Sequence, residues 1–387
     1  MDAPGYFRLS LICSAMSLST WGCARTCGAA NSGASVAIYI GTDTAPDKGQ
    51  GIYLTYLNLM TGELSPPQLA AETVNPTFLA LHPSHKFLFA ASNVSLPNHP
   101  AEGAATAFAI DPSTGKLTMI NQQPSGGPGP CHVSIAPDGR HLVLGNYTGG
   151  SFAVLPVDAD GKLAEPGCVI QDDNSDPARR PHGHCSQFDP TGKFVVGDDL
   201  GLDKIFVFRF DPGSGVLTSN APPAADTVRR AGPRHFAFHP NGKWGYNINE
   251  LNSTMGAYAW DARRGVLTEM QTLSTLPADF HDKSSCAEVV VDPAGRFLYG
   301  SNRGDDSIAV FKIDPESGRL TPAGRAPTGG RTPRSFALDP GGNWLVAANQ
   351  DSGTVMVFKI DAGTGALTPN GQAVAVKSAV CVMFAPK

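Results

Sequence analysis

Helix-forming patterns and clustered positive charge are largely missing from this sequence. We find no convincing stretch of a dozen residues with apolar positions every three to four residues, as an amphipathic helix requires. There is no run of Lys and Arg, and the formal net charge is −5. These absences argue against a mainly helical protein and against a nucleic-acid partner.

Cysteines that would form a disulfide framework are also missing. Three of the eight cysteines lie within the first 27 residues, and the other five are scattered and odd in number, without a CxxC pair: Cys131, Cys168, Cys185, Cys286 and Cys381. We expect these five to be small buried side chains. Cysteine usage therefore does not indicate a cellular compartment.

Motifs of the common hydrolases and nucleotide-binding enzymes are absent too. The chain has no GxSxG, no convincing Ser-His-Asp order and no phosphate-binding loop. The glycine-rich stretch Gly126-Gly-Pro-Gly129 is expected to be a turn rather than a nucleotide cradle.

Long apolar runs are scarce, and the nearest to one is Leu9–Ala24, which follows Arg8. Residues 1–35 are interpreted either as a cleaved export signal or as a disordered extension. The acidic Asp2 and the interrupting Ser, Thr and Gly residues speak against a signal, whereas Ala29-Ala30 favours one. The run is too short and too polar for a membrane span, and we expect none.

Glycine and proline are abundant, with 43 and 32 residues, and a proline-centred hairpin motif recurs along the chain. Its copies are LHPSHKFLF, IAPDGRHLV, FDPTGKFVV, FHPNGKWGY, VDPAGRFLY and LDPGGNWLV, and a seventh proline, Pro386, closes VMFAPK. Successive prolines are 46 to 54 residues apart. A period near fifty with several strands per repeat is typical of propeller blades.

The two ends of the chain complete each other. Each period continues with a third and a fourth strand around Asp-Pro-x-x-Gly turns, as in IAVFKIDPESGRLTP. The C-terminal repeat has only its first strand, and the segment from residue 36 has the others without a first. Joining them closes a ring without free edge strands. We predict an all-β, seven-bladed β-propeller of four-stranded antiparallel blades, with one composite blade, as a single domain over residues 36–387.

Two positions flanking each hairpin vary in chemistry from blade to blade. Six residues before the proline lie Thr77, Cys131, His184, Arg234, Ala287, Arg334 and Val380, and ten after it lie Asn93, Tyr147, Leu200, Glu250, Arg303 and Gln350. Because the hairpin strands are antiparallel, both positions lie at one rim of the ring. His184, Arg234, Glu250, Arg303 and Arg334 are therefore expected to converge at one mouth of the central channel.

Three guanidiniums, an imidazole and a carboxylate suit a small anionic or carbonyl-bearing ligand. The alternative is that each arginine pairs with an acid and ties blades together. We include Tyr147, Asp199, His132 and His182 as candidate substrate contacts, although Asp199 also occupies a small-polar position expected to form a strand-exit turn. The His182-x-His184 pair has the spacing of a metal site, but no acidic cluster accompanies it, and we predict no metal. Glu288 is interpreted either as an internal ion-pair partner or as a ligand.

At these residues the chain resembles the lactonase seven-bladed β-propeller family, which includes propeller-type 6-phosphogluconolactonase and carboxy-cis,cis-muconate cyclase. The resemblance covers residues 36–387. Its carriers are IYIGT, GNYTGGS, PHGH with FDPTGKFVVGDDLGLD, GPRHFAFHPNGK, NEL and RFLYGSNRGDDSI. Cys131 before His132 and the N-terminal leader depart from the family pattern.

The resemblance implies hydrolysis of a sugar-acid lactone, most plainly 6-phosphogluconolactone or a related aldonolactone. The family's proposed site falls on His182 or His184, Arg234, Glu250 and Arg303. In our hypothesis Glu250 is the general base, Arg234 stabilises the oxyanion, His184 protonates the ring oxygen, and Arg303 and Arg334 hold the anionic group.

Two alternatives stay open: a muconate-type lactone cycloisomerase, or a propeller that binds a ligand or protein without catalysis. We expect a monomer that acts on a small anionic lactone without a cofactor. Its location would be cytoplasmic, as for the family, or periplasmic or secreted if the leader is an export signal.

Overall fold

The structure is a computed structural model of the 387-residue chain, and it describes Met1 and residues 35–172 and 177–386. The predicted leader, residues 1–35, lies outside the described residues except at its two ends. All of the described strands belong to one compact unit, which begins at Ala34. No helix in the described part of the chain is long and apolar enough to cross a membrane.

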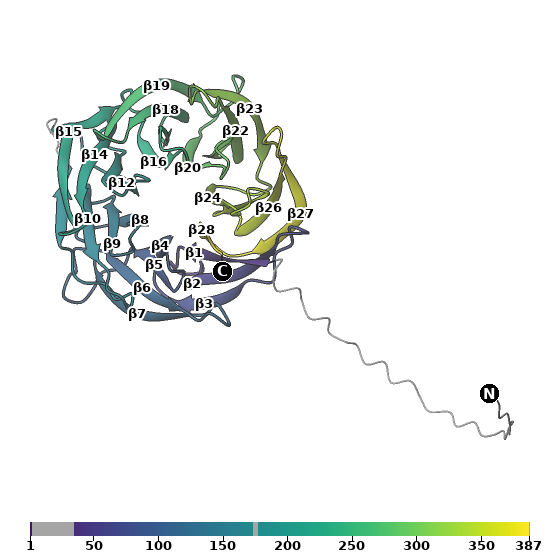
Figure 1. Cartoon of the computed structure of the whole chain (residues 1–387), viewed down its shortest axis with the longest axis horizontal. Helices are drawn as coiled ribbons and strands as arrows, with labels where there is room; N and C mark the ends of the chain where they lie inside the picture. Colours follow the sequence, from purple (N-terminus) through teal and green to yellow (C-terminus); the bar gives the residue numbers. More distant parts are fainter. Residues whose placement is uncertain (2–34, 173–176, 387) are drawn as a thin grey trace. The chain divides into compact units, whose positions relative to one another are not determined.

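The described residues form seven four-stranded antiparallel sheets arranged as a ring (Figure 1). From the channel outward, the first four blades are β28 (Ala379–Ala385), β1 (Ser35–Thr42), β2 (Gly51–Asn58), β3 (Gln68–Glu72); β4 (Pro76–Leu81), β5 (Phe87–Ser92), β6 (Ala104–Ile110), β7 (Leu117–Pro124); β8 (Pro130–Ile135), β9 (His141–Asn146), β10 (Ser151–Pro156), β11 (Cys168–Gln171); and β12 (Gly183–Phe188), β13 (Phe194–Asp199), β14 (Lys204–Asp211), β15 (Val216–Asp226). The other three are β16 (Pro233–Phe238), β17 (Trp244–Asn249), β18 (Thr254–Asp261), β19 (Val266–Ser274); β20 (Ser285–Val291), β21 (Phe297–Arg303), β22 (Ser307–Ile313), β23 (Leu320–Pro327); and β24 (Pro333–Leu338), β25 (Trp344–Asn349), β26 (Thr354–Ile360), β27 (Leu367–Ala375). The predicted seven-bladed propeller is confirmed.

One blade combines the N-terminal and C-terminal strands, as the two incomplete repeats predicted. β28 pairs antiparallel with β1, with Ile38 opposite Phe384 and Ile40 opposite Val382. This pairing gives both strands a neighbour where each would otherwise present an unpaired edge.

The turn residues explain why the hairpins recur. In the hairpin from β16 to β17, Gly242 after Pro240-Asn241 has a φ of +68°, a conformation that favours glycine. Its equivalents Gly139, Gly192, Gly295 and Gly342 also have positive φ. The Pro-x-Gly sequence therefore fixes both the turn and the register of the two inner strands.

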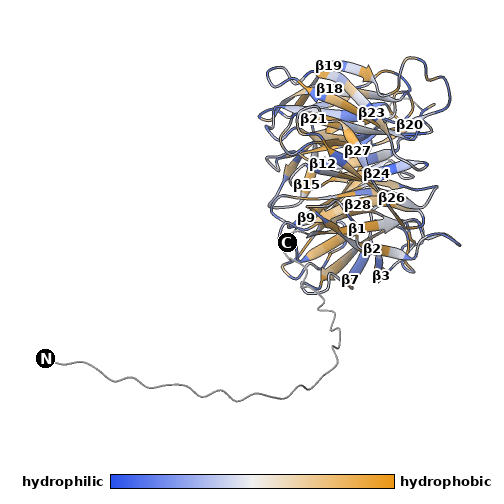
Figure 2. Ribbon diagram, turned by 90° about the vertical axis from the view of Figure 1, so that its right-hand side faces the viewer, coloured by the Kyte–Doolittle hydropathy of each residue, from blue (hydrophilic) through white to orange (hydrophobic). Residues whose placement is uncertain are grey.

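The core consists of seven apolar clusters, and each lies between two neighbouring blades. One cluster joins Val36 and Ile38 to Trp344 and Val346, across the composite blade and its neighbour. The other six repeat this arrangement around the ring. Figure 2 shows hydrophobic residues concentrated within the blades and hydrophilic residues in the loops of the two faces. With its core between the blades, the ring leaves the inner strands free to line a central channel.

Candidate active site

Each inner strand has a β-bulge just before the rim of the channel. In β16, Pro233 pairs with Asn249 and His235 with Ile248, so Arg234 is an extra residue without a partner. The same irregularity occurs in the other six inner strands, at Thr77, Cys131, His184, Ala287–Glu288, Arg334 and Val380. Because a bulge interrupts the alternation of side chains, it can direct adjacent residues to the same face. Arg234 and His235 consequently both line the channel.

A pocket of about 270 Å³ opens at this rim. Its lining includes most of the blade-to-blade variable positions: Thr77, Asn93, Cys131, Tyr147, His184, Arg234, Glu250, Arg303, Arg334 and Val380. Ala287, Leu200 and Gln350, the remaining variable positions, do not line it. The five residues expected to converge come from four consecutive blades of the ring, and they meet in one pocket.

Glu250 is held between two arginines. Its Oε2 accepts a hydrogen bond from Arg234 Nε at 2.8 Å and forms an ion pair with Arg303 Nη2 at 3.0 Å. Burial opposes ionisation of Glu250, but the charges of Arg234 and Arg303 outweigh it and hold the pKa of the carboxyl below its ordinary value. Glu250 is therefore an anion over a wide pH range, with its other oxygen not engaged by these two arginines.

The third guanidinium, Arg334, is in a different situation. Within the described residues it forms no ion pair, whereas Arg234 and Arg303 are both bonded to Glu250. Burial and the two neighbouring guanidiniums lower the pKa of Arg334 to about 10. A guanidinium that is desolvated and unpaired at the wall of a pocket is ready to bind an anion or an oxygen that gains negative charge.

His184 lines the same pocket and is 4% exposed. Its Nδ1 is buried and has no hydrogen-bond partner among the residues described here. Burial, together with the charges of Arg234 and neighbouring His235, holds the pKa of His184 well below its ordinary value. His184 is accordingly a neutral imidazole near neutral pH.

Three of the predicted substrate contacts lie outside this pocket. His182 precedes β12, stacks on Tyr147 with ring centroids 4.5 Å apart, and lines a neighbouring pocket with Arg179, Arg180, Arg229 and Arg230. On a regular strand, residues two apart such as His182 and His184 would face the same side. Here His182 lies before β12, and the bulge in this strand redirects His184. His132 lies one layer deeper in the channel, where its Nδ1 accepts a hydrogen bond from Ser186 N.

Asp199 is fully buried, and its side chain forms hydrogen bonds with the backbone. Its carboxylate accepts hydrogen bonds from His182 N and from Leu202 N, the latter at 2.7 Å. Asn146, at the same position of its own hairpin, donates to Ser125 O, just after the last strand of the preceding blade. These small polar residues therefore stabilise loops at the rim.

His235 is the main residue of this region that the sequence reasoning missed. It lines the pocket beside Arg234 because of the bulge, which strand alternation does not predict. The sequence does contain a signal for this residue, because the position five before each proline also varies in chemistry from blade to blade: Phe78, His132, Cys185, His235, Glu288, Ser335 and Cys381.

Among the residues that the structure describes, no group of three or more His, Cys, Asp and Glu side chains is arranged to hold a metal ion.

Comparisons with known proteins give the site its context. The family model described as lactonase, 7-bladed beta-propeller, matches residues 37–384. A 6-phosphogluconolactonase of Bacillus subtilis is 37% identical over 301 residues, covering 77% of this chain and 83% of that protein. A 6-phosphogluconolactonase of Formosa agariphila is 35% identical, covering 78% of this chain and 86% of that protein.

Among solved structures, the periplasmic gluconolactonase of Pseudomonas aeruginosa superimposes with a TM-score of 0.83 at 32% identity, covering 90% of this chain and 99% of that one. The family that the sequence motifs suggested is confirmed. This chain belongs to the lactonase seven-bladed β-propeller family.

Proposed function

We propose that this protein hydrolyses a sugar-acid lactone, 6-phosphogluconolactone or a related aldonolactone, in the pocket around Glu250. The observation that carries the proposal is an ionised carboxylate held by two arginines beside a third, unpaired arginine, in one pocket at the rim of the channel. The relatives named as 6-phosphogluconolactonases and as a gluconolactonase support the reaction class.

Glu250 is the proposed general base. Its carboxylate takes a proton from a water molecule, and the water oxygen forms a bond to the lactone carbonyl carbon. The low pKa makes Glu250 a modest base, but it also keeps the group in its active form well into the acidic range. Arg234 and Arg303 therefore act first by holding Glu250 ionised and in place.

Arg334 is the guanidinium best placed to stabilise the tetrahedral oxyanion or to hold the anionic group of the substrate, since the other two are engaged by Glu250. This reassigns the oxyanion from Arg234, to which the sequence interpretation gave it. When the intermediate collapses, the bond from the carbonyl carbon to the ring oxygen breaks, and the proton that Glu250 took from the water passes to the ring oxygen. A neutral His184 contributes by hydrogen bonding to that oxygen.

The test is an assay of the purified protein against δ-gluconolactone, its 6-phosphate and a muconolactone, with EDTA as a control for metal. We expect turnover of at least one aldonolactone above the spontaneous rate, unaffected by EDTA. Reaction of the muconolactone alone would favour a cycloisomerase, and turnover of none would favour a binding protein. The ratio of kcat/KM for the two gluconolactones then decides whether the phosphate is recognised.

A further inference from the structure

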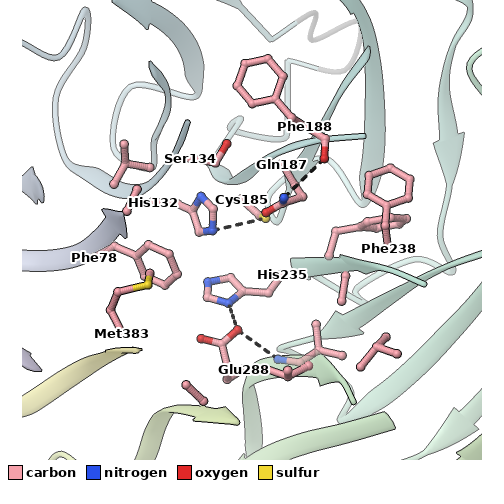
Figure 3. Close-up of a pocket in the computed structure, with 18 of the residues that line it drawn as sticks. Phe78, His132, Ser134, Cys185, Gln187, Phe188, His235, Phe238, Glu288 and Met383 are labelled. Atoms are coloured by element: carbon pink, nitrogen blue, oxygen red, sulfur yellow. Dashed lines mark hydrogen bonds and ion pairs between the residues drawn. The ribbon is translucent and has the colours of Figure 1, made fainter. Parts of the chain in front are cut away.

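Directly beneath Arg234, two buried titratable residues are joined across neighbouring inner strands. His235 of β16 lies 2.8 Å from Glu288 of β20, measured from Nδ1 to Oε1. Both side chains point into the channel, as Figure 3 shows, and both are at most one-tenth exposed. They line a second pocket, of about 760 Å³, on the far side of the Arg234 layer, and His235 lines both pockets.

We propose that His235 and Glu288 are positioning residues that hold the Arg234 guanidinium in the orientation required to fix Glu250. The kinetic consequence rests on the proposed lactonase function, but the structural consequence does not. The two residues form the lower half of a chain of contacts that runs from Glu288 through His235 and Arg234 to Glu250.

The chemistry of arginine fixes the direction of these hydrogen bonds. Arg234 Nη1 lies 3.1 Å from His235 Nε2, and a guanidinium can only donate. His235 Nε2 must therefore accept, which places the ring proton on Nδ1, where it is donated to Glu288. Burial and the charges of Arg234 and Arg334 hold the pKa of His235 well below its ordinary value, so the ring remains the neutral acceptor that this contact needs.

Arg234 depends on this contact because its side chain is only 3% exposed. Its Nε is bonded to Glu250, and its Nη1 is shared between His235 and Ala287 O, the latter at 2.7 Å. Without His235 the guanidinium would keep two of these three partners. A buried guanidinium that loses a partner reorients or admits water, because an unsatisfied buried charge is costly. Either response would move the atom that holds Glu250.

Another blade shows that this arrangement is specific to one place in the channel. His132 occupies the equivalent position in β8, but its Nδ1 accepts from Ser186 N and its Nε2 faces Cys185 Sγ at 3.7 Å. Its ring centroid is 5.2 Å from that of His235. Within the described residues, His235 is the one imidazole with a hydrogen bond to an arginine side chain.

The kinetic test compares His235→Phe, which keeps a ring of similar shape, with the wild type. Displacement of a catalytic group by about 1 Å can cost about 10²-fold in rate, so we expect a loss of that order in kcat with KM little changed. Glu288→Gln, whose side-chain oxygen still accepts from His235, should retain more kcat than Glu288→Leu.

The matched control is His239→Phe, which removes a buried imidazole bonded to Gly295 O away from the rim pocket. It should lower Tm without lowering kcat. If His235→Phe also lowers Tm and leaves kcat unchanged, the two residues are structural and the proposal is wrong.

A second measurement does not need lactonase activity. ¹⁵N NMR of the imidazole side chains, assigned by the signal lost in His235→Phe, should show His235 neutral with its proton on Nδ1 at neutral pH. The Nε signal of Arg234 should shift in the His235→Phe variant. A proton on Nε2, or a His235 that titrates at its ordinary pKa, would overturn the proposal even if the enzyme is fully active.

Discussion

The two ends of the central channel are made by the same seven strands, yet they differ in chemistry. At the rim, the residues six before each proline include His184, Arg234 and Arg334. At the opposite mouth, the residues two before each proline are all apolar: Leu81, Ile135, Phe188, Phe238, Val291, Leu338 and Phe384. The residues of the apolar end pack beside the hairpin turns that every blade needs, so these residues must be apolar in each blade. The residues at the rim do not pack beside these turns. Charged and titratable residues therefore occur at the end of the channel where the blade repeat does not require an apolar side chain.

Glu250→Gln should have the largest effect, because it removes the proposed base and leaves Arg234 and Arg303 without their shared anion. Loss of a general base typically lowers rate by about 10²- to 10⁴-fold, and we expect a drop of that size in kcat for the lactone that the wild type hydrolyses. Glu316→Gln, at an exposed turn, is the matched control. Full activity in Glu250→Gln would show that another group is the base.

Arg334→Gln should rank second. It removes the unpaired guanidinium while leaving the contacts of Glu250 intact. Loss of one oxyanion donor costs about 10²- to 10³-fold in kcat, and the exposed Arg319→Gln serves as the control. A rise in KM for the 6-phosphate alone, with kcat unchanged, would instead assign Arg334 to the phosphate.

Much of the difference between the two ends of the channel can be predicted from the sequence, because turn motifs, strand repeats and strand direction can be recognised there. The Pro-x-Gly hairpins set the period, the two incomplete repeats set the composite blade, and antiparallel pairing places Arg234 and Glu250 at the same rim. The first feature depends on residues close in sequence, the second on counting the strands of each repeat, and the third on strand direction.

The features that the sequence did not predict depend on register. The bulge at Arg234 arises from how β16 pairs with β17, and no residue type at that position signals it. It turns His235 into the channel, and the equivalent bulge in β12 separates His184 from His182. Asp199 does not line the rim pocket, and the sequence could not show this, because its partners are backbone N–H groups whose positions only the folded loops define.

The pH dependence of kcat/KM should show a smaller effect, which reports on the ionisation of Glu250. The arginines lower the pKa of Glu250 in the folded state, so the carboxylate persists as pH falls through the ordinary glutamate value of about 4.3. The stability that it contributes is present above that value and is lost only as pH falls through the lower, folded pKa. We expect kcat/KM, corrected for spontaneous hydrolysis, to stay level down to that range. An acidic limb with a midpoint well above the ordinary glutamate value would identify a different essential group.

The smallest effect is expected at the apolar mouth. Phe238 packs against Trp260 and Phe236, with ring centroids 5.3 and 5.0 Å apart, and it lines the deeper pocket but not the rim pocket. Phe238→Leu keeps an apolar side chain at this half-buried position but loses volume and both ring contacts, so we expect a cost of about 0.5–3 kcal/mol of unfolding free energy. Denaturant unfolding should register that loss while kcat and KM stay at wild-type values. A clear fall in kcat would mean that the two ends are coupled through the layer of His132, His235 and Glu288 between them, so the rim could not be treated as an independent site.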